Sequence, residues 1–248
     1  MNPFRRSSIF CILILGFTAL SFGEDSIRTF PGGGGDVYSV AFSPDGTKIL
    51  AGIGAIPTKL WDAETGAVIQ TFSGHIGADV MSVAYSPDGT KVLTGSTDHT
   101  AILWDAGTGA VIWTLSGHSA EIYSVAFSPD GTKALTGSLD YTAKLWDVGT
   151  GAEIRTFSGL DFVLSVAFSP DGTKVLTGNG DGTAKLWNTD TAAEIRTFSG
   201  HTSDILAVGF SPDGMKVLTG SMDGTAKLWD AETGTAVRTF SGTSYVNS

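Results

Sequence analysis

The chain has 248 residues, 42% of them hydrophobic and 33 of them glycine, with a formal net charge of −10. This content suffices for the core of one domain of ordinary size, and eight prolines are too few for a disordered chain. The acidic balance argues against nucleic acid and anionic membranes as partners, because phosphate binding depends on clustered Lys and Arg.

The first element along the chain is a candidate secretory signal peptide over residues 1–23. Arg5 and Arg6 precede an apolar run over 9–20, and small residues at Ser21 and Gly23 occupy the −3 and −1 positions of a cleavage point before Glu24. A membrane anchor is the alternative, but the run is shorter than the roughly 20 residues of a spanning helix. Cleavage would remove the only cysteine and take the net charge to −12. We therefore expect a secreted or periplasmic protein without disulfides or thiol chemistry.

The rest of the chain, residues 24–248, is a fivefold repeat. Ser-Pro-Asp-Gly begins at Ser43, Ser86, Ser128, Ser169 and Ser211, and a Leu-Trp pair follows each copy. Successive tryptophans of these pairs lie 41 to 43 residues apart. Such regular self-similarity indicates a repeat architecture built from copies of one unit. The units extend over about 27–66, 67–109, 110–151, 152–192 and 193–242.

Each unit contains four short segments with the character of strands. In the second copy we expect strands over 80–85, 91–95, 100–104 and 111–115. Pro87 and Gly89 favour a turn after the first of them, since Pro fixes φ and Gly accepts positive φ. Four antiparallel strands in roughly 42 residues form one propeller blade. The predicted fold is therefore all-β, a propeller of five four-stranded blades.

The order of these motifs resembles that of WD-repeat β-propellers: Gly-His, a strand, Ser-Pro-Asp-Gly, an Asp turn and Trp-Asp. The resemblance covers about 27–242 and implies a rigid platform for partners rather than an enzyme. The Trp-containing segment occurs five times, whereas the fourth strand, of the Ile-Arg-Thr-Phe type, occurs six times. One strand is thus surplus. Either five blades close into a ring with a spare strand, or the chain forms an open arc that can associate with itself.

The repeats share a set of four residue types: a His, a Thr, an Asp and a Trp. The resemblance implies that these residues form a structural hydrogen-bonded network within each blade. A nucleophilic triad is the competing interpretation, but a catalytic site needs one copy and not several. The members are His75, Thr94, Asp98 and Trp104; His118, Thr136, Asp140 and Trp146; Thr177, Asp181 and Trp187; and His201, Thr219, Asp223 and Trp229.

Two repeats depart from this pattern. The fourth has Leu160 at the His position and Asn188 after its Trp. The first has Gly35, Ala51 and Ala55 for the His, Thr and Asp, and Pro57 in its expected third strand. We expect the first blade to be the least stable and to lie at a seam.

Because the blades are near copies of one another, the positions at which their residues differ are the candidates for binding. The start of the first strand, the position two residues earlier and the position before the Asp turn combine carboxylates with apolar and aromatic residues. The candidate partner-binding residues are Asp36, Tyr38, Asp79, Met81, Glu121, Tyr123, Leu139, Phe162, Leu164, Asp204, Leu206 and Met222. They fit a protein or peptide that presents a basic residue near an apolar one.

Two other functions stay open. An enzyme or small-ligand protein could use the central funnel of the propeller, although the even Trp spacing leaves no room for an inserted active-site loop. The chain could also be a fragment of a longer repeat array. The four histidines show no metal-ligand spacing, so neither a metal nor another cofactor is expected.

Overall fold

The computed structural model describes residues 30, 35–159 and 161–242. Its strands form five antiparallel four-stranded sheets, here called blades 1 to 5, and each sheet follows the chain order. This confirms the predicted all-β propeller of five four-stranded blades. The predicted signal peptide, the first copy of the fourth strand near Arg28 and the residue Leu160 all fall in parts of the chain outside the described residues. Within the described residues, no helix is long and apolar enough to cross a membrane.

The strand bounds are nearly the same from blade to blade. Blade 1 consists of β1 (Val37–Phe42), β2 (Lys48–Ile53), β3 (Thr58–Asp62) and β4 (Val68–Phe72). Blade 2 consists of β5 (Val80–Tyr85), β6 (Lys91–Ser96), β7 (Thr100–Asp105) and β8 (Val111–Ser116). Blade 3 consists of β9 (Ile122–Phe127), β10 (Lys133–Ser138), β11 (Ala143–Asp147) and β12 (Glu153–Phe157). Blade 4 consists of β13 (Val163–Phe168), β14 (Lys174–Asn179), β15 (Thr183–Asn188) and β16 (Glu194–Ser199). Blade 5 consists of β17 (Ile205–Phe210), β18 (Lys216–Ser221), β19 (Thr225–Asp230) and β20 (Ala236–Ser241).

The Ser-Pro-Asp-Gly segment closes the first hairpin of every blade. In blade 2, the hydroxyl of Ser86 donates to the Asp88 carboxylate at 2.6 Å and accepts the Lys91 N–H at 2.9 Å. Gly89 has a φ of 70°, a left-handed conformation that Gly adopts without steric cost. The motif therefore fixes the turn with its own side chains, which explains why each copy folds in the same way.

Packing between blades supplies the core. Leu50, Leu60 and Phe72 of blade 1 pack against Val92 and Trp104 of blade 2, and the rings of Phe72 and Trp104 meet edge to face at 5.5 Å. Equivalent clusters join blade 2 to blade 3, blade 3 to blade 4 and blade 4 to blade 5. The same two faces thus form every contact between successive blades, as expected of a repeat protein.

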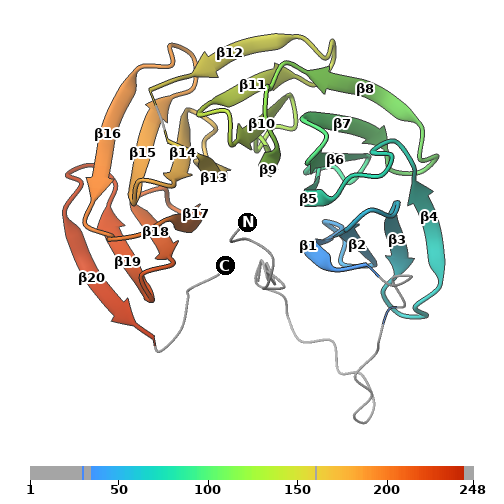
Figure 1. The fold of residues 1–248 in the computed structure, drawn as a ribbon, viewed down its shortest axis with the longest axis horizontal. Coiled ribbons are helices and arrows are strands. Elements are labelled where there is room, and N and C mark those ends of the chain that lie inside the picture. Colours follow the sequence, from blue (N-terminus) through green and yellow to red (C-terminus); the bar gives the residue numbers. More distant parts are fainter. Residues whose placement is uncertain (1–29, 31–34, 160, 243–248) are drawn as a thin grey trace.

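The five blades form an open arc, which settles the question that the sequence left open. The innermost strands pack in succession, β1 beside β5, β5 beside β9, β9 beside β13 and β13 beside β17. No comparable packing joins β17 to β1 among the described residues, and a gap separates blade 5 from blade 1 (Figure 1). Blades 1 and 5 therefore each have one face that no other blade covers.

The expectation that Pro57 lies within the third strand of blade 1 is wrong. Strand β3 begins one residue later, at Thr58, and its ladder with β2 starts from the pair Ala51 and Lys59. Proline has no N–H to donate to a ladder, so the strand begins after it.

Candidate functional site

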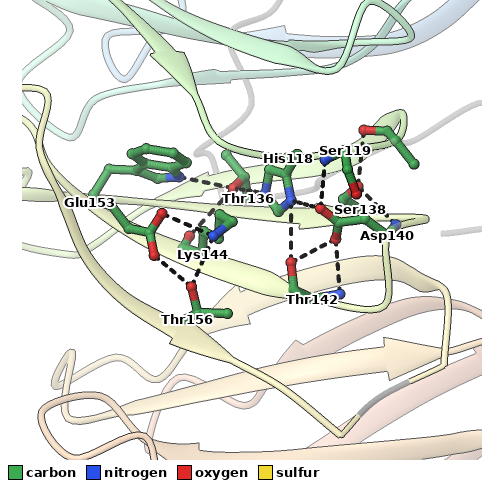
Figure 2. Close-up of polar contacts among 11 residues, drawn as sticks. His118, Ser119, Thr136, Ser138, Asp140, Thr142, Lys144, Glu153 and Thr156 are labelled. Atoms are coloured by element: carbon green, nitrogen blue, oxygen red, sulfur yellow. Dashed lines mark hydrogen bonds and ion pairs between the residues drawn. The ribbon is translucent and has the colours of Figure 1, made fainter.

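The repeated polar network lies inside the blades, and blade 3 shows it completely (Figure 2). Nδ1 of His118 lies 2.8 Å from the Asp140 carboxylate, and its Nε2 lies 2.7 Å from the Thr136 hydroxyl. The indole N–H of Trp146 donates to the same hydroxyl at 2.9 Å. A neutral imidazole protonated on Nδ1 satisfies every member, since Nδ1–H donates to Asp140 while Nε2 accepts from Thr136.

The network is unsuited to catalysis because it is closed to substrates. His118 is 8% exposed and Thr136 is fully buried. Burial lowers the pKa of His118, against the opposing effect of the Asp140 carboxylate, which keeps the imidazole neutral. Blades 2 and 5 repeat the same distances, with His75 and His201 in the central position. A buried, fully paired chain of this kind holds β-strands together.

Blade 4 contains only part of the network. The Trp187 indole donates to the Thr177 hydroxyl at 3.2 Å, whereas Asp181, among the described residues, accepts bonds only from Thr183 in its own turn. Asn179 stands where blades 2, 3 and 5 have Ser, and its side-chain carbonyl is buried without a hydrogen-bond partner among the described residues. The turn of blade 4 is therefore tied less firmly to its strands.

Blade 1 has none of the network. With Ala51 at the Thr position, the indole N–H of Trp61 is buried without an acceptor within the described part of the chain, and the hydroxyl of Thr58 is buried there without a partner. An unpaired buried polar group costs roughly 1–3 kcal/mol. Blade 1 thus combines two unpaired buried groups with the loss of the whole network, and its lower stability stays a prediction.

The candidate binding residues gather at one end of the strands, and a repeated backbone bond joins them. In every blade, the residue before the Asp turn donates its N–H to the carbonyl of the residue directly before the first strand. The donor and acceptor pairs are Gly54 and Asp36, Thr97 and Asp79, Leu139 and Glu121, Gly180 and Phe162, and Met222 and Asp204, at 2.9 to 3.0 Å. We call this end of the arc the acidic-apolar face.

Carboxylates and phenols from blades 1, 2 and 3 meet on this face. The hydroxyl of Tyr38 donates to the Asp79 carboxylate at 3.3 Å. Burial, then the charges of Asp79 and Asp36, raise the pKa of Tyr38. Burial, then the charges of Glu121 and Asp79, raise the pKa of Tyr123. Asp79 therefore acts on both phenols, whereas Asp36 acts on Tyr38 and Glu121 acts on Tyr123.

An aromatic pair and a second carboxylate pair continue the face across blades 3 to 5. The rings of Tyr141 and Phe162 stack with centroids 5.1 Å apart, and Tyr141 is half exposed. Burial, then the nearby Asp161 carboxylate, raise the pKa of Asp204. The apolar patch thus lies between two acidic patches.

The remaining candidates contribute unequally. Met81, Leu139, Leu206 and Met222 are partly buried and keep some surface for a partner. Leu164 is 7% exposed and offers almost none.

Sequence reasoning missed Tyr141 and Asp161. Tyr141 has a φ of 68° at a turn position that His or Gly occupies in blades 2, 4 and 5. A bulky aromatic residue in this strained conformation is unusual, and the alignment of the repeats alone could have singled it out. No group of three or more His, Cys, Asp or Glu among the described residues is arranged to hold a metal ion.

Comparison with known families agrees with this architecture. Residues 36–188 match the family model described as the IFT122 first beta-propeller, and residues 192–230 match the WD domain, G-beta repeat. The chain therefore belongs to the WD-repeat β-propellers, a family whose members generally serve as non-enzymatic scaffolds for protein interactions. No curated protein matches the chain.

Proposed function

We propose that this protein is an extracytoplasmic scaffold that binds a partner protein or peptide on its acidic-apolar face. The observation that carries the proposal is the gathering of Asp36, Asp79 and Glu121 around Tyr38 and Tyr123. No salt bridge within the described residues involves these three carboxylates. Their charge is thus available to a cation from outside.

The partner that fits this face presents a Lys or Arg beside an apolar side chain. A cation would sit between the carboxylates and the phenol rings, where opposite charge and the π-faces both attract it. The stacked Tyr141 and Phe162 supply an aromatic anchor of the kind that dominates interface energies. Charge would orient the partner and the aromatic pair would hold it.

A displayed peptide library tests this function directly. Selection on the wild-type protein should enrich sequences with Lys or Arg next to an aromatic or aliphatic residue. The double variant Asp79→Asn, Glu121→Gln should bind the selected peptides at least about tenfold more weakly, because two attractive charges are lost. The matched control Glu64→Gln, Asp190→Asn removes two exposed carboxylates from turns at the opposite end of the strands.

Two outcomes would contradict the proposal. One is selection of peptides without basic residues, and the other is an equal loss of binding in the control variant. The variant Phe162→Ala separates the contributions, since it should weaken binding without changing the salt dependence.

The extracytoplasmic location rests on residues 1–23 and has a separate test. Expression of the full chain in a bacterial host should yield a periplasmic or secreted product whose N-terminal residue is Glu24. Replacing Leu13 and Leu15 with Arg should keep the chain in the cytoplasm, since it interrupts the apolar run. A full-length cytoplasmic product from the wild-type chain would contradict this location.

A further inference from the structure

The two ends of the arc expose complementary halves of one interface. The tail face, on blade 5, consists of Leu218, Ala226, Leu228 and Phe240. The head face, on blade 1, consists of Val37, Val40, Phe42 and Ile49. Each set occupies the positions that form the contact between blades elsewhere in the arc.

The tail face is apolar surface that is buried in every other blade. Leu218 is 48% exposed, whereas the equivalent Leu176 of blade 4 is fully buried. Phe240 is 46% exposed, whereas the equivalent Phe198 is fully buried. The strand that carries Leu228 has the same Thr-Ala-Lys-Leu-Trp sequence as the third strand of blade 4. The two surfaces differ because blade 5 packs on blade 4, whereas among the described residues no blade packs on Leu218 and Phe240.

The head face shows the same contrast. Phe42 is 58% exposed, whereas its equivalents Tyr85, Phe127, Phe168 and Phe210 pack against the core of the preceding blade. Val37 and Ile49 are partly exposed, although the equivalent Ile205 and Val217 of blade 5 are fully buried.

One residue covers part of the head face from within the chain. The ring of Phe30 meets Trp61 edge to face at 6.2 Å. In the internal interfaces this position belongs to the last strand of the preceding blade, as in Phe198 on Trp229 at 5.8 Å. Phe30 thus takes the place of one side chain that a preceding blade supplies elsewhere, and Phe42 stays exposed among the described residues.

We propose that the tail face of one molecule binds the head face of a second copy. Every interface within the arc already joins these two surfaces, so the contact between copies extends an interface that the protein builds four times. In it, Phe240 would take the place of Phe30 against Trp61, and Leu218 would be covered as Leu176 is. This inference concerns surfaces distinct from the acidic-apolar face and does not depend on the function proposed for that face.

The contact between copies should be weaker than the internal ones. At each internal interface a serine hydroxyl accepts a backbone N–H of the next blade, as Ser165 does from Val208 at 3.1 Å. Blade 5 has Ala207 at this position, so that bond cannot form. Because the two faces differ, the association is heterologous, and it produces either a closed pair of arcs or an open array.

Complementary variants test the pairing. Wild-type protein at about 1–100 µM, a range that covers micromolar dissociation constants, should form dimers or larger species by light scattering. Phe42→Lys lacks a functional head and Leu218→Lys lacks a functional tail, so each alone should be monomeric. Mixed in equal amounts, they should form a one-to-one heterodimer, because each retains the face that the other needs. Both positions are exposed in the single copy, so folding should be unchanged.

Ile154→Lys is the matched control, since Ile154 is 38% exposed on the outer strand of blade 3. It should associate like the wild type. A monomeric wild type would overturn the proposal, as would association of either single variant alone or failure of the mixture. Peptide binding on the acidic-apolar face should be unchanged in both end variants, which keeps the two proposals separately testable.

Discussion

The contribution of the buried network to the free energy of unfolding can be measured by removing one hydroxyl from blade 3. Thr136→Val preserves the shape of the side chain and deletes the oxygen that serves both His118 and Trp146. The indole N–H then has no acceptor and the imidazole Nε2 has no donor, in a site where Thr136 is fully buried. At roughly 1–3 kcal/mol for each unpaired group, the free energy of unfolding should fall by about 2–6 kcal/mol.

Blade 4 offers a matched control. Thr177 is as fully buried as Thr136, but among the described residues its hydroxyl makes one hydrogen bond, to the Trp187 indole. Thr177→Val should therefore leave one unpaired group and cost about 1–3 kcal/mol. The comparison removes the effect of replacing a hydroxyl by a methyl group, which is common to both variants.

Urea unfolding followed by tryptophan fluorescence measures the global loss, and hydrogen exchange locates it. Exchange should accelerate most in β10 and β11 for Thr136→Val, and in β14 and β15 for Thr177→Val, because repeat proteins open locally. If Thr177→Val costs as much as Thr136→Val, the imidazole bond contributes nothing measurable. The network would then be no more than a pair formed by Thr and Trp.

Two further predictions follow from single residues. Ala51→Thr should stabilise blade 1 by about 1 kcal/mol, because it offers the Trp61 indole an acceptor; hydrogen exchange in β2 should slow, and unchanged exchange would refute the account. The hydrogen bond from Ser128, then those from Thr132, lower the pKa of Asp130 to about 2, below its value of about 3.9 in an unfolded chain. This carboxylate therefore stabilises the fold above about pH 4, and its contribution is lost as pH falls toward 2. Asp130→Asn should flatten that part of a pH-unfolding curve, and an unchanged curve would contradict the cause given for the shift.

Much of the blade could be predicted because its determinants are local. The turn at Ser86 to Gly89 is fixed by bonds between residues at most five apart, and β5 has the bounds that the sequence pattern predicted. A single sequence is enough to identify both the side chains that fix a turn and the alternation of residues that indicates a strand.

The open arc could not be predicted because it depends on how blades accumulate around the axis. Side-chain packing at each interface, such as that of Phe72 on Trp104, sets a small rotation between two successive blades. No sequence motif indicates the sum of these rotations. The stacking of Tyr141 on Phe162 was missed for a similar reason. The two residues come from different blades, and their contact exists only once those blades are placed side by side.

Blade 1 combines unpaired buried polar groups with a position at the end of the arc. Within the residues that the structure describes, blade 1 has unpaired groups at Trp61 and Thr58 and a neighbouring blade on one face only. In a nearest-neighbour description, its stability depends on a single interface. A second copy bound through the head face would add another, so blade 1 should be the part of the molecule that association stabilises most.

Concentration should therefore control the stability of blade 1. Above the dissociation constant, the concentration of free partner faces grows as the square root of total protein. Each tenfold rise in protein concentration therefore adds about 0.7 kcal/mol to a state stabilised by binding. Hydrogen exchange in β1 and β2 should slow as concentration rises, while exchange in β10, at the centre of the arc, should change little. Phe42→Lys should abolish this dependence and Ile154→Lys should retain it. Concentration-independent exchange in β1, in a sample shown to be associated, would mean that the copies meet through some other surface.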